Sequence, residues 1–233
     1  MLQFSLHHLA QPALDRAAGV KPPLLVLLHG YGSNEEDLFG LAPWLDERCV
    51  IVSARGPLTL SPGAYAWFRI AFVAGWSDAA GEGAPFSVDM AAADESCRLL
   101  IQFVEDAVRA YDADPQRVFL LGFSQGASMA LLTLLRAPDK VAGVAAMSGF
   151  LLPTINLSPA QRAALAGKPV MLTHGTDDDI VPIALGRQAR DVLSALPVAL
   201  TWREYPMRHQ ITDESLDDVS QWLERLTIER LSD

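Results

Sequence analysis

Cysteine is scarce in this chain, because Cys49 and Cys97 are the only two among 233 residues. At most one disulfide can form, which excludes a small disulfide-stapled scaffold. No basic segment followed by an apolar run opens the sequence, so we expect no secretory signal. No apolar stretch approaches the roughly 18 residues of a membrane span. We therefore expect a cytoplasmic protein without an integral membrane segment.

Basic residues are also in deficit. The chain has 18 Lys and Arg against 28 Asp and Glu, which gives a net charge of −10. Nucleic-acid binding needs clustered Lys and Arg, so we do not expect nucleic acid as a partner. Half of the residues are hydrophobic and a fifth are charged, a composition that builds a core. At this length we expect residues 1–233 to form one domain.

Short apolar runs alternate with helical patterns along the chain. Most of the runs are continuously apolar, which is typical of strands covered on both faces. This order predicts an α/β fold with a mostly parallel sheet and helices on both faces. The expected strands are residues 24–28, 49–53, 117–121, 141–147, 170–173 and 200–205, and the expected helices are 35–45, 89–111, 125–136, 182–196 and 212–231.

Two stretches follow neither pattern. Residues 59–87 are rich in glycine, proline and aromatic residues, Trp67 and Phe68 among them. Residues 149–157 form a second apolar loop that contains Phe150 and Leu151. Long loops in compact domains are usually functional or disordered, and these are too apolar for disorder. Two interpretations stay open: extra core packing, or the wall of an apolar ligand pocket.

A serine lies where a strand is expected to meet a helix. The segment Gly122-Phe123-Ser124-Gln125-Gly126 matches G-x-S-x-G and joins the strand at 117–121 to the helix at 125–136. In that context the motif places a serine on a sharp, strained turn with its hydroxyl exposed. The flanking glycines let neighbouring backbones approach closely. Ser124 is the candidate nucleophile, and the alternative is an ordinary serine-capped turn.

A serine nucleophile needs a base and, behind the base, an acid. His209 follows the last expected strand, in a loop at the strand's carboxyl end, where sites in such sheets lie. His174 precedes Gly175 at the end of another strand and is expected to support a turn mainly. The run Asp177-Asp178-Asp179 supplies the acid, and its register stays open from the residues alone.

A tetrahedral intermediate also needs two amide donors for its oxyanion. One would come from Gln125 and the other from Tyr31, in the glycine-bearing loop after residues 24–28. Such a loop could instead bind phosphate. The dinucleotide spacing G-x-G-x-x-G is not met, however, because Glu35 occupies the last position.

These motifs together resemble the carboxylesterase/phospholipase family of α/β-hydrolases, which includes the acyl-protein thioesterases. The likeness runs from about Leu24 to the last expected helix. It rests on four segments: His29-Gly30-Tyr31-Gly32, residues 122–126, residues 174–182 and His209. The resemblance implies Asp178 as the acid, the Tyr31 and Gln125 amides as the oxyanion hole, and an aromatic substrate loop near Trp67 and Phe68. Dienelactone hydrolases use a cysteine nucleophile, so serine at position 124 counts against them.

We therefore expect a serine hydrolase that cleaves carboxylic esters, with thioesters and lysophospholipids as candidate substrates. The expected triad is Ser124, His209 and Asp178, acting through an acyl-enzyme with no metal or organic cofactor. The partner is a small or lipid-like ester, and its acyl length stays open, as does the oligomeric state. The candidate substrate-binding residues are Trp67, Phe68, Phe150 and Leu151. The alternative is a non-catalytic hydrolase-fold binding protein or scaffold, which should lack one or more catalytic parts.

Overall fold

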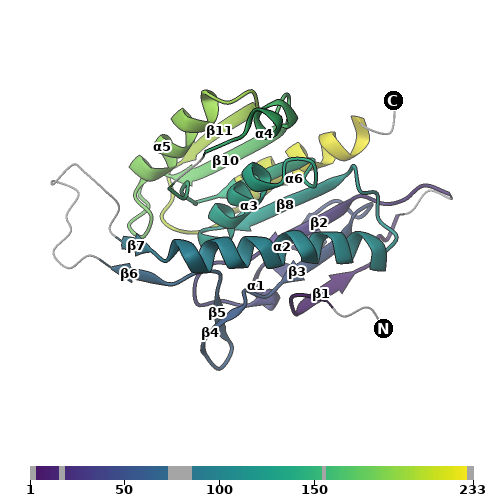
Figure 1. Cartoon of the computed structure of the whole chain (residues 1–233), viewed down its shortest axis with the longest axis horizontal. Helices are drawn as coiled ribbons and strands as arrows, with labels where there is room; N and C mark the ends of the chain where they lie inside the picture. The colour runs from purple at the N-terminus through teal and green to yellow at the C-terminus, as the bar shows by residue number, and fades with distance from the viewer. Residues whose placement is uncertain (1–3, 16–18, 73–85, 154–155, 230–233) are drawn as a thin grey trace.

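The computed structural model describes residues 4–15, 19–72, 86–153 and 156–229 (Figure 1). Within these ranges a seven-stranded sheet runs in the order β1-β3-β2-β8-β9-β10-β11. β1 pairs antiparallel with β3, and the other neighbours pair in parallel. Its strands are β1 (His8–Gln11), β2 (Leu24–Leu28), β3 (Val50–Ala54), β8 (Val118–Phe123), β9 (Gly143–Met147), β10 (Pro169–Gly175) and β11 (Ala199–Tyr205). The predicted α/β fold is confirmed, with strand boundaries within two residues of those expected.

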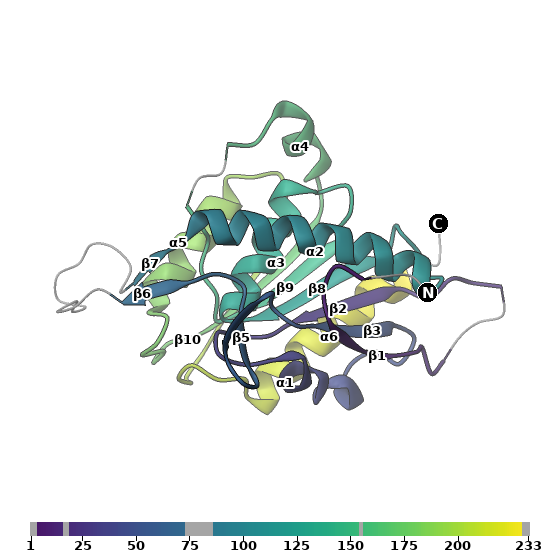
Figure 2. The same ribbon diagram turned by 60° about the horizontal axis from the view of Figure 1, so that its bottom comes forward.

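Helices cover both faces of the sheet (Figure 2). One face carries α2 (Met90–Ala110), α3 (Gln125–Arg136) and α5 (Ile183–Ser194), and the other carries α1 (Glu35–Phe39) and α6 (Asp213–Glu229). No helix in the described ranges is both long and apolar enough to cross a bilayer.

The central strand β2 shows why its sequence is apolar throughout. Leu24, Val26 and Leu28 pack into the core under α2 and α3, whereas Leu25 and Leu27 pack into the core under α6. Successive side chains of a strand point to opposite faces, so a strand covered twice must be apolar at every position.

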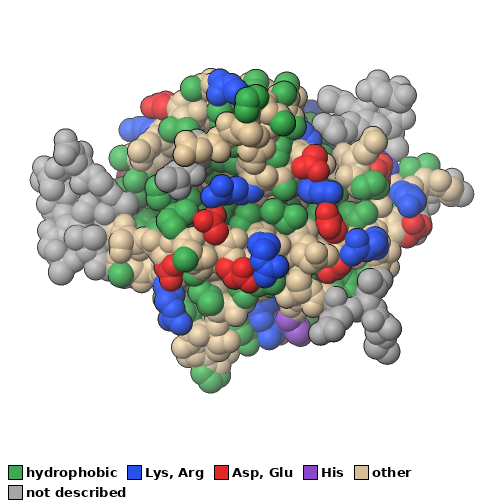
Figure 3. Space-filling view, in the orientation of Figure 1, with side chains coloured by type: hydrophobic (Ala, Val, Ile, Leu, Met, Phe, Trp, Pro, Cys, Tyr) green, Lys and Arg blue, Asp and Glu red, His purple; other side chains and the backbone are tan. Residues whose placement is uncertain are grey.

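The face crossed by α2 carries interleaved charges of both signs (Figure 3). Arg98 pairs with Glu95 within α2, and Lys140 reaches Glu105 from beyond α3. Arg98 and Lys140 thus each have an acidic partner. Basic and acidic side chains are interspersed on this face, so they do not form the concentrated basic surface that phosphate groups need.

The first helix is shorter than predicted. α1 ends at Phe39, and a 3₁₀ turn, η1 (Ala42–Trp44), replaces the rest of the helix expected at 35–45. The reason is local, because Gly40 favours a helix end and Pro43 has no N–H to donate to the preceding turn. The start is as expected, since the Asn34 side chain accepts from the Glu36 N–H at 2.8 Å.

Several short elements were missed by sequence analysis. The edge strand β1 is one, and two antiparallel strand pairs lie in the aromatic stretch: β4 (Leu58–Ser61) with β5 (Ala64–Ala66), and β6 (Ile70–Phe72) with β7 (Phe86–Val88). Residues 73–85 of that stretch, with Trp76, lie outside the described residues, as do residues 154–155 of the second loop and the predicted helix end at 230–231. The helix α4 (Pro159–Ala164) was also missed. Its signal was readable, because Ser158 and Gln161 form a capping box at its N-terminus.

The backbones of α3 and β2 approach closely where α3 begins against the end of β2. A Cβ added at Gly126 would stand 1.9 Å from the Leu28 carbonyl oxygen, and one at Gly122 would stand 2.3 Å from the Gly126 oxygen. Both obstacles are backbone atoms of buried elements, which cannot rotate away. The two glycines therefore set the distance between α3 and the sheet.

Gly126→Ala should destabilise the protein by about 3 kcal/mol or more, at the upper end of overpacking costs, because the clash falls on a strand carbonyl. Urea unfolding measures this. Gly40→Ala is the control, since Gly40 has an ordinary φ of −58° and its added Cβ would lie 3.3 Å from the Asp37 oxygen. Equal stability of the two variants would contradict the close-packing argument.

Candidate active site

Ser124 occupies a strained position between β8 and α3. Its backbone has φ 56° and ψ −116°, in a region that residues other than glycine rarely adopt. Its N–H donates to the Met147 carbonyl at 2.8 Å, which anchors the turn to the neighbouring strand. Such strain persists only when the surroundings enforce it, and it collects at functional sites.

His209 lies within hydrogen-bond distance of both Ser124 and Asp178. Its Nε2 is 2.9 Å from Ser124 Oγ, and its Nδ1 is 2.7 Å from Asp178 Oδ2. A carboxylate can only accept, so Nδ1 carries the proton and Nε2 accepts from the serine hydroxyl. The imidazole packs against the Phe123 ring with centroids 4.9 Å apart, and its side chain is 13% exposed.

The three residues come from three different strand ends. Ser124 follows β8, Asp178 follows β10, and His209 follows β11. Parallel strands present their carboxyl ends at one edge of the sheet, which brings together residues up to 85 positions apart. The loops of Asp178 and His209 are joined by a hydrogen bond from the Asp177 N–H to the Met207 carbonyl.

Of the three adjacent aspartates, Asp178 is the one that contacts His209. Its Oδ1 accepts from the Ile180 and Val181 N–H groups at 3.0 and 2.8 Å. Asp177 is exposed, and Asp179 pairs with the exposed guanidinium of Arg208. The residues alone left this register open, and the family resemblance implied Asp178, which is the carboxylate that turns inward to His209.

The charge of Asp178 is maintained although its side chain is buried. Burial disfavours the carboxylate, but hydrogen bonds from His174, His209 and the Val181 N–H outweigh it and hold the pKa of Asp178 well below its ordinary value.

His174 does more than support a turn. Its Nε2 lies 2.8 Å from the Val181 carbonyl and 3.4 Å from Asp178 Oδ2, and its side chain is buried. The ring lies against α5 at Gly186, where an added Cβ would stand 2.5 Å from its Nδ1. The bond to the Val181 carbonyl agrees with the expected role of His174 in supporting a turn, and the contact with Asp178, the carboxylate that faces His209, was not expected.

The candidate oxyanion donors lie beside Ser124. Gln125 opens α3, where a helical N–H has no carbonyl partner within the helix. The Gly30–Tyr31 segment approaches from the end of β2, and a Cβ added at Gly30 would lie 3.5 Å from Ser124 Cβ. The structure thus brings the Tyr31 and Gln125 backbones to the same serine.

An apolar pocket of about 240 Å³ opens at Ser124 and His209. Phe150 lines it, as sequence analysis expected. The apolar lining that was missed is Ile70, Phe86, Phe123, Ile180 and Val181. The sequence held a signal for three of these, since Phe123 lies inside the serine motif and Ile180 and Val181 directly follow the aspartates.

Trp67 and Phe68 do not line this pocket, and neither does Leu151. Both aromatic side chains are completely buried, with 0% exposure. The Trp67 N–H donates to Gln125 Oε1, and Gln125 Nε2 donates to the Phe68 carbonyl, each at 2.8 Å. The expectation that these aromatics form the pocket wall is corrected, because their backbones bind Gln125 from behind the site.

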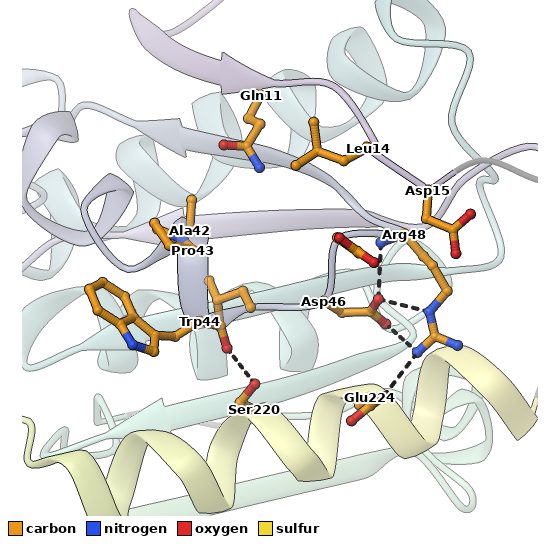
Figure 4. A pocket seen from close by; sticks show the side chains of 12 residues that line it. Gln11, Leu14, Asp15, Ala42, Pro43, Trp44, Asp46, Arg48, Ser220 and Glu224 are labelled. Atoms are coloured by element: carbon orange, nitrogen blue, oxygen red, sulfur yellow. Dashed lines mark hydrogen bonds and ion pairs between the residues drawn. The ribbon is translucent and has the colours of Figure 1, made fainter.

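A larger hollow of about 680 Å³ lies elsewhere, between η1 and α6 (Figure 4). Arg48 Nε donates to Asp46 Oδ1 at 2.8 Å, and Ser220 Oγ donates to the Trp44 carbonyl at 2.6 Å. Its described lining contains no histidine, so it offers no base for a serine. The described residues also hold no cluster of three or more His, Cys, Asp or Glu suited to a metal ion.

The sequence from residue 11 to residue 227 matches the profile of the family described as Phospholipase/Carboxylesterase. The chain belongs to the phospholipase/carboxylesterase family. The resemblance seen in the motifs is thereby confirmed, and the family assignment covers every strand end that carries a candidate site residue.

Individual members of the phospholipase/carboxylesterase family are similar to this chain over different lengths. Acyl-protein thioesterase 1 of Gibberella zeae is 35% identical over 114 residues, about half of each chain (48%). A probable inactive carboxylesterase of Oryza sativa subsp. japonica is 28% identical over 223 residues, covering 93% of this chain and 89% of that one. The crystal structure of the Bacillus cereus carboxylesterase aligns with a TM-score of 0.78 at 25% identity and covers 94% of both chains.

Asp178→Asn should lower the free energy of unfolding by about 1.5–3 kcal/mol near neutral pH, the worth of hydrogen bonds to a charged group. Because the folded pKa of Asp178 lies below its unfolded value, near 3.9, this contribution is present above about pH 4 and is lost as pH falls further. Urea unfolding from pH 7 to pH 3 should show that the difference in unfolding free energy between wild type and variant becomes smaller as the pH falls. The exposed Asp177→Asn serves as control, and a gap that stays constant with pH would contradict the argument.

Proposed function

We propose that this chain is a serine hydrolase that cleaves carboxylic esters, with thioesters as further candidate substrates, through an acyl-enzyme. The observation that carries the proposal is the chain of hydrogen bonds Ser124–His209–Asp178 at the mouth of an apolar pocket. Its geometry meets the demands of nucleophile, base and orienting acid in turn. We also propose that residues 1–233 form one domain, supported by the single seven-stranded sheet that joins His8 to Tyr205.

In the first half-reaction, Ser124 Oγ attacks the acyl carbonyl while its proton moves to His209 Nε2. The carbonyl π electrons move to the oxygen, which becomes an oxyanion facing the Tyr31 and Gln125 amides. When the tetrahedral intermediate collapses, the bond to the leaving group breaks and His209 gives that group the proton. The products are a free alcohol or thiol and an acyl group on Ser124.

In the second half-reaction, water replaces the alcohol. His209 takes a proton from water as the water oxygen attacks the acyl-enzyme, and it returns the proton to Ser124 Oγ when the acid leaves. Asp178 stays ionised throughout, because its pKa is held low, and its charge stabilises the imidazolium formed in each step. The pocket lining receives the apolar part of the acyl chain.

The rival interpretation is a non-catalytic hydrolase-fold binding protein, and one relative is a probable inactive carboxylesterase. A binding protein has no need for a strained serine turn or for an aligned base and acid. The hydrogen bonds that join Ser124, His209 and Asp178 support catalysis over this alternative. Covalent labelling separates the two, since a receptor without an activated serine does not react with a fluorophosphonate.

A fluorophosphonate should label Ser124, and Ser124→Ala should abolish labelling and lower kcat for p-nitrophenyl esters by about 10⁴-fold or more. Intact-protein mass spectrometry followed by peptide mapping identifies the labelled serine. Ser61→Ala, on the exposed hairpin, is the matched control and should react like wild type. Label that persists in Ser124→Ala on another serine would refute the assignment of the nucleophile.

Phe150→Leu should shift the substrate preference of the enzyme towards longer acyl chains. The Phe150 ring lines the pocket and packs against the Phe86 ring, with ring centroids 4.8 Å apart, so a smaller side chain leaves more room. Each additional methylene that fits is worth about 0.8 kcal/mol, or about fourfold in relative kcat/KM. A p-nitrophenyl ester series from acetate to octanoate measures the change. Trp44→Ala removes an exposed aromatic side chain from the other hollow and should leave the series unchanged. If Phe150→Leu changes kcat/KM by the same factor for every ester in the series, this ring does not contact the acyl chain.

A further inference from the structure

His29 lies at the end of β2 with no solvent exposure, directly before the loop that carries Tyr31. Both ring nitrogens have partners in the backbone. Nε2 is 2.9 Å from the Gly56 nitrogen, and Nδ1 is 2.7 Å from the Gly30 carbonyl oxygen. The family's catalytic scheme, as set out above, uses neither contact.

The two partners decide which nitrogen of His29 carries the proton. The Gly56 N–H can only donate, so Nε2 must be an acceptor and the proton must be on Nδ1. Burial lowers the pKa of His29 and keeps the ring neutral, which this arrangement requires. His29 Nδ1–H therefore donates to the Gly30 carbonyl, which also accepts from the Ser33 N–H at 3.3 Å.

The Gly30 carbonyl and the Tyr31 N–H belong to one peptide unit. A trans peptide is planar, and its C=O and N–H point in opposite directions. Holding the Gly30 oxygen towards His29 and Ser33 therefore turns the Tyr31 N–H to the opposite side of the unit. Gly30 and Tyr31 line the pocket at Ser124, and a Cβ added at Gly30 would lie 3.5 Å from Ser124 Cβ, so this peptide borders the place where a substrate carbonyl would sit.

Trp67 links His29 to the other candidate donor. Trp67 Nε1–H donates to the His29 carbonyl at 3.0 Å, and the Trp67 backbone N–H donates to Gln125 Oε1 at 2.8 Å. The Trp67 ring also packs on the His29 ring, with centroids 5.5 Å apart. One fully buried residue thus sets the spacing between the Tyr31 segment and the Gln125 segment.

We propose that His29 is a positioning residue that aims the Tyr31 N–H at the oxyanion, with Trp67 holding His29 in register with Gln125. This inference rests on the proposed serine-hydrolase function. An oxyanion donor acts mainly in the transition state, so a misaimed Tyr31 N–H should lower kcat and leave KM nearly unchanged. A histidine that only fills the core would instead affect stability.

Two amide replacements each keep one of the two contacts of His29. In His29→Asn the side-chain N–H takes the place of Nδ1 and still reaches the Gly30 carbonyl. In His29→Gln the longer side chain reaches the place of Nε2 and accepts from Gly56, but the donor to Gly30 is lost. His29→Asn leaves the buried Gly56 N–H without its acceptor, so it should melt at the lower temperature.

The positioning role therefore predicts opposite orders for activity and stability. His29→Gln should lose about 10- to 100-fold in kcat, the loss expected when a catalytic group moves by about 1 Å, whereas His29→Asn should keep most of its kcat. Affinity for a boronic acid that forms a tetrahedral adduct with Ser124 should fall in parallel with kcat. His7→Asn, a change at an exposed histidine, is the control.

All kcat values are expressed per serine titrated with a fluorophosphonate. An unlabelled wild type would overturn the proposed function, whereas a labelled wild type makes the variants a test of His29 alone. A kcat in His29→Asn equal to or below that of His29→Gln, or an effect confined to KM, would overturn the inference.

If neither His29 variant folds, Trp67→Phe decides, since it keeps a buried ring and removes the Nε1–H bond to His29. A lower kcat with unchanged KM supports the proposal, and an unchanged kcat overturns it.

Discussion

The contact between Gly126 and the Leu28 carbonyl is the constraint on which the rest of the site depends. It brings the first turn of α3 against the end of β2 with no room for a side chain. Ser124 therefore lies at a fixed distance from the segment that continues β2, where Gly30 and Tyr31 follow. One backbone approach thereby brings the candidate nucleophile, which has a positive φ of 56°, close to both candidate oxyanion donors.

Electrostatic interactions fix the orientation of Asp178 and His209. The Asp178 carboxylate is buried, and such a group is stable as an anion only with several donors around it. The Ile180 and Val181 N–H groups, His209 and His174 supply them. Because these donors use the carboxylate oxygens so fully, the His209 ring has one favourable orientation, with Nε2 towards Ser124. The apolar pocket lies beside the hydrogen-bonded series Ser124–His209–Asp178 and does not interrupt it.

The mostly parallel α/β sheet and the boundaries of six of its strands could be predicted, because strands covered on both faces are continuously apolar. The serine turn could be predicted because the Gly122–Gly126 motif has a mechanical reason for its glycines. Sequence reasoning also selected Ser124 and His209, through strand-end positions and chain order. It failed where burial depends on distant segments. Trp67 and Phe68 suited an acyl pocket by composition, but whether an aromatic faces a cavity or the core depends on what α2, α3 and β2 leave unfilled.

By itself the sequence determined the α/β fold, the serine turn and a short set of partners for Ser124, since these depend on periodicity and local backbone chemistry. The residues alone did not decide among the three aspartates, and the family resemblance implied Asp178; in the tertiary structure the Asp178 carboxylate turns inward to His209. Ile70 and Phe86 line the pocket, where Trp67 had been expected. The tertiary structure also gave His29 and His174 their contacts with Gly30 and Asp178. A hydrogen bond between segments far apart, or between a side chain and a neighbouring carbonyl, depends on directions in space, and only the packed sheet sets those directions.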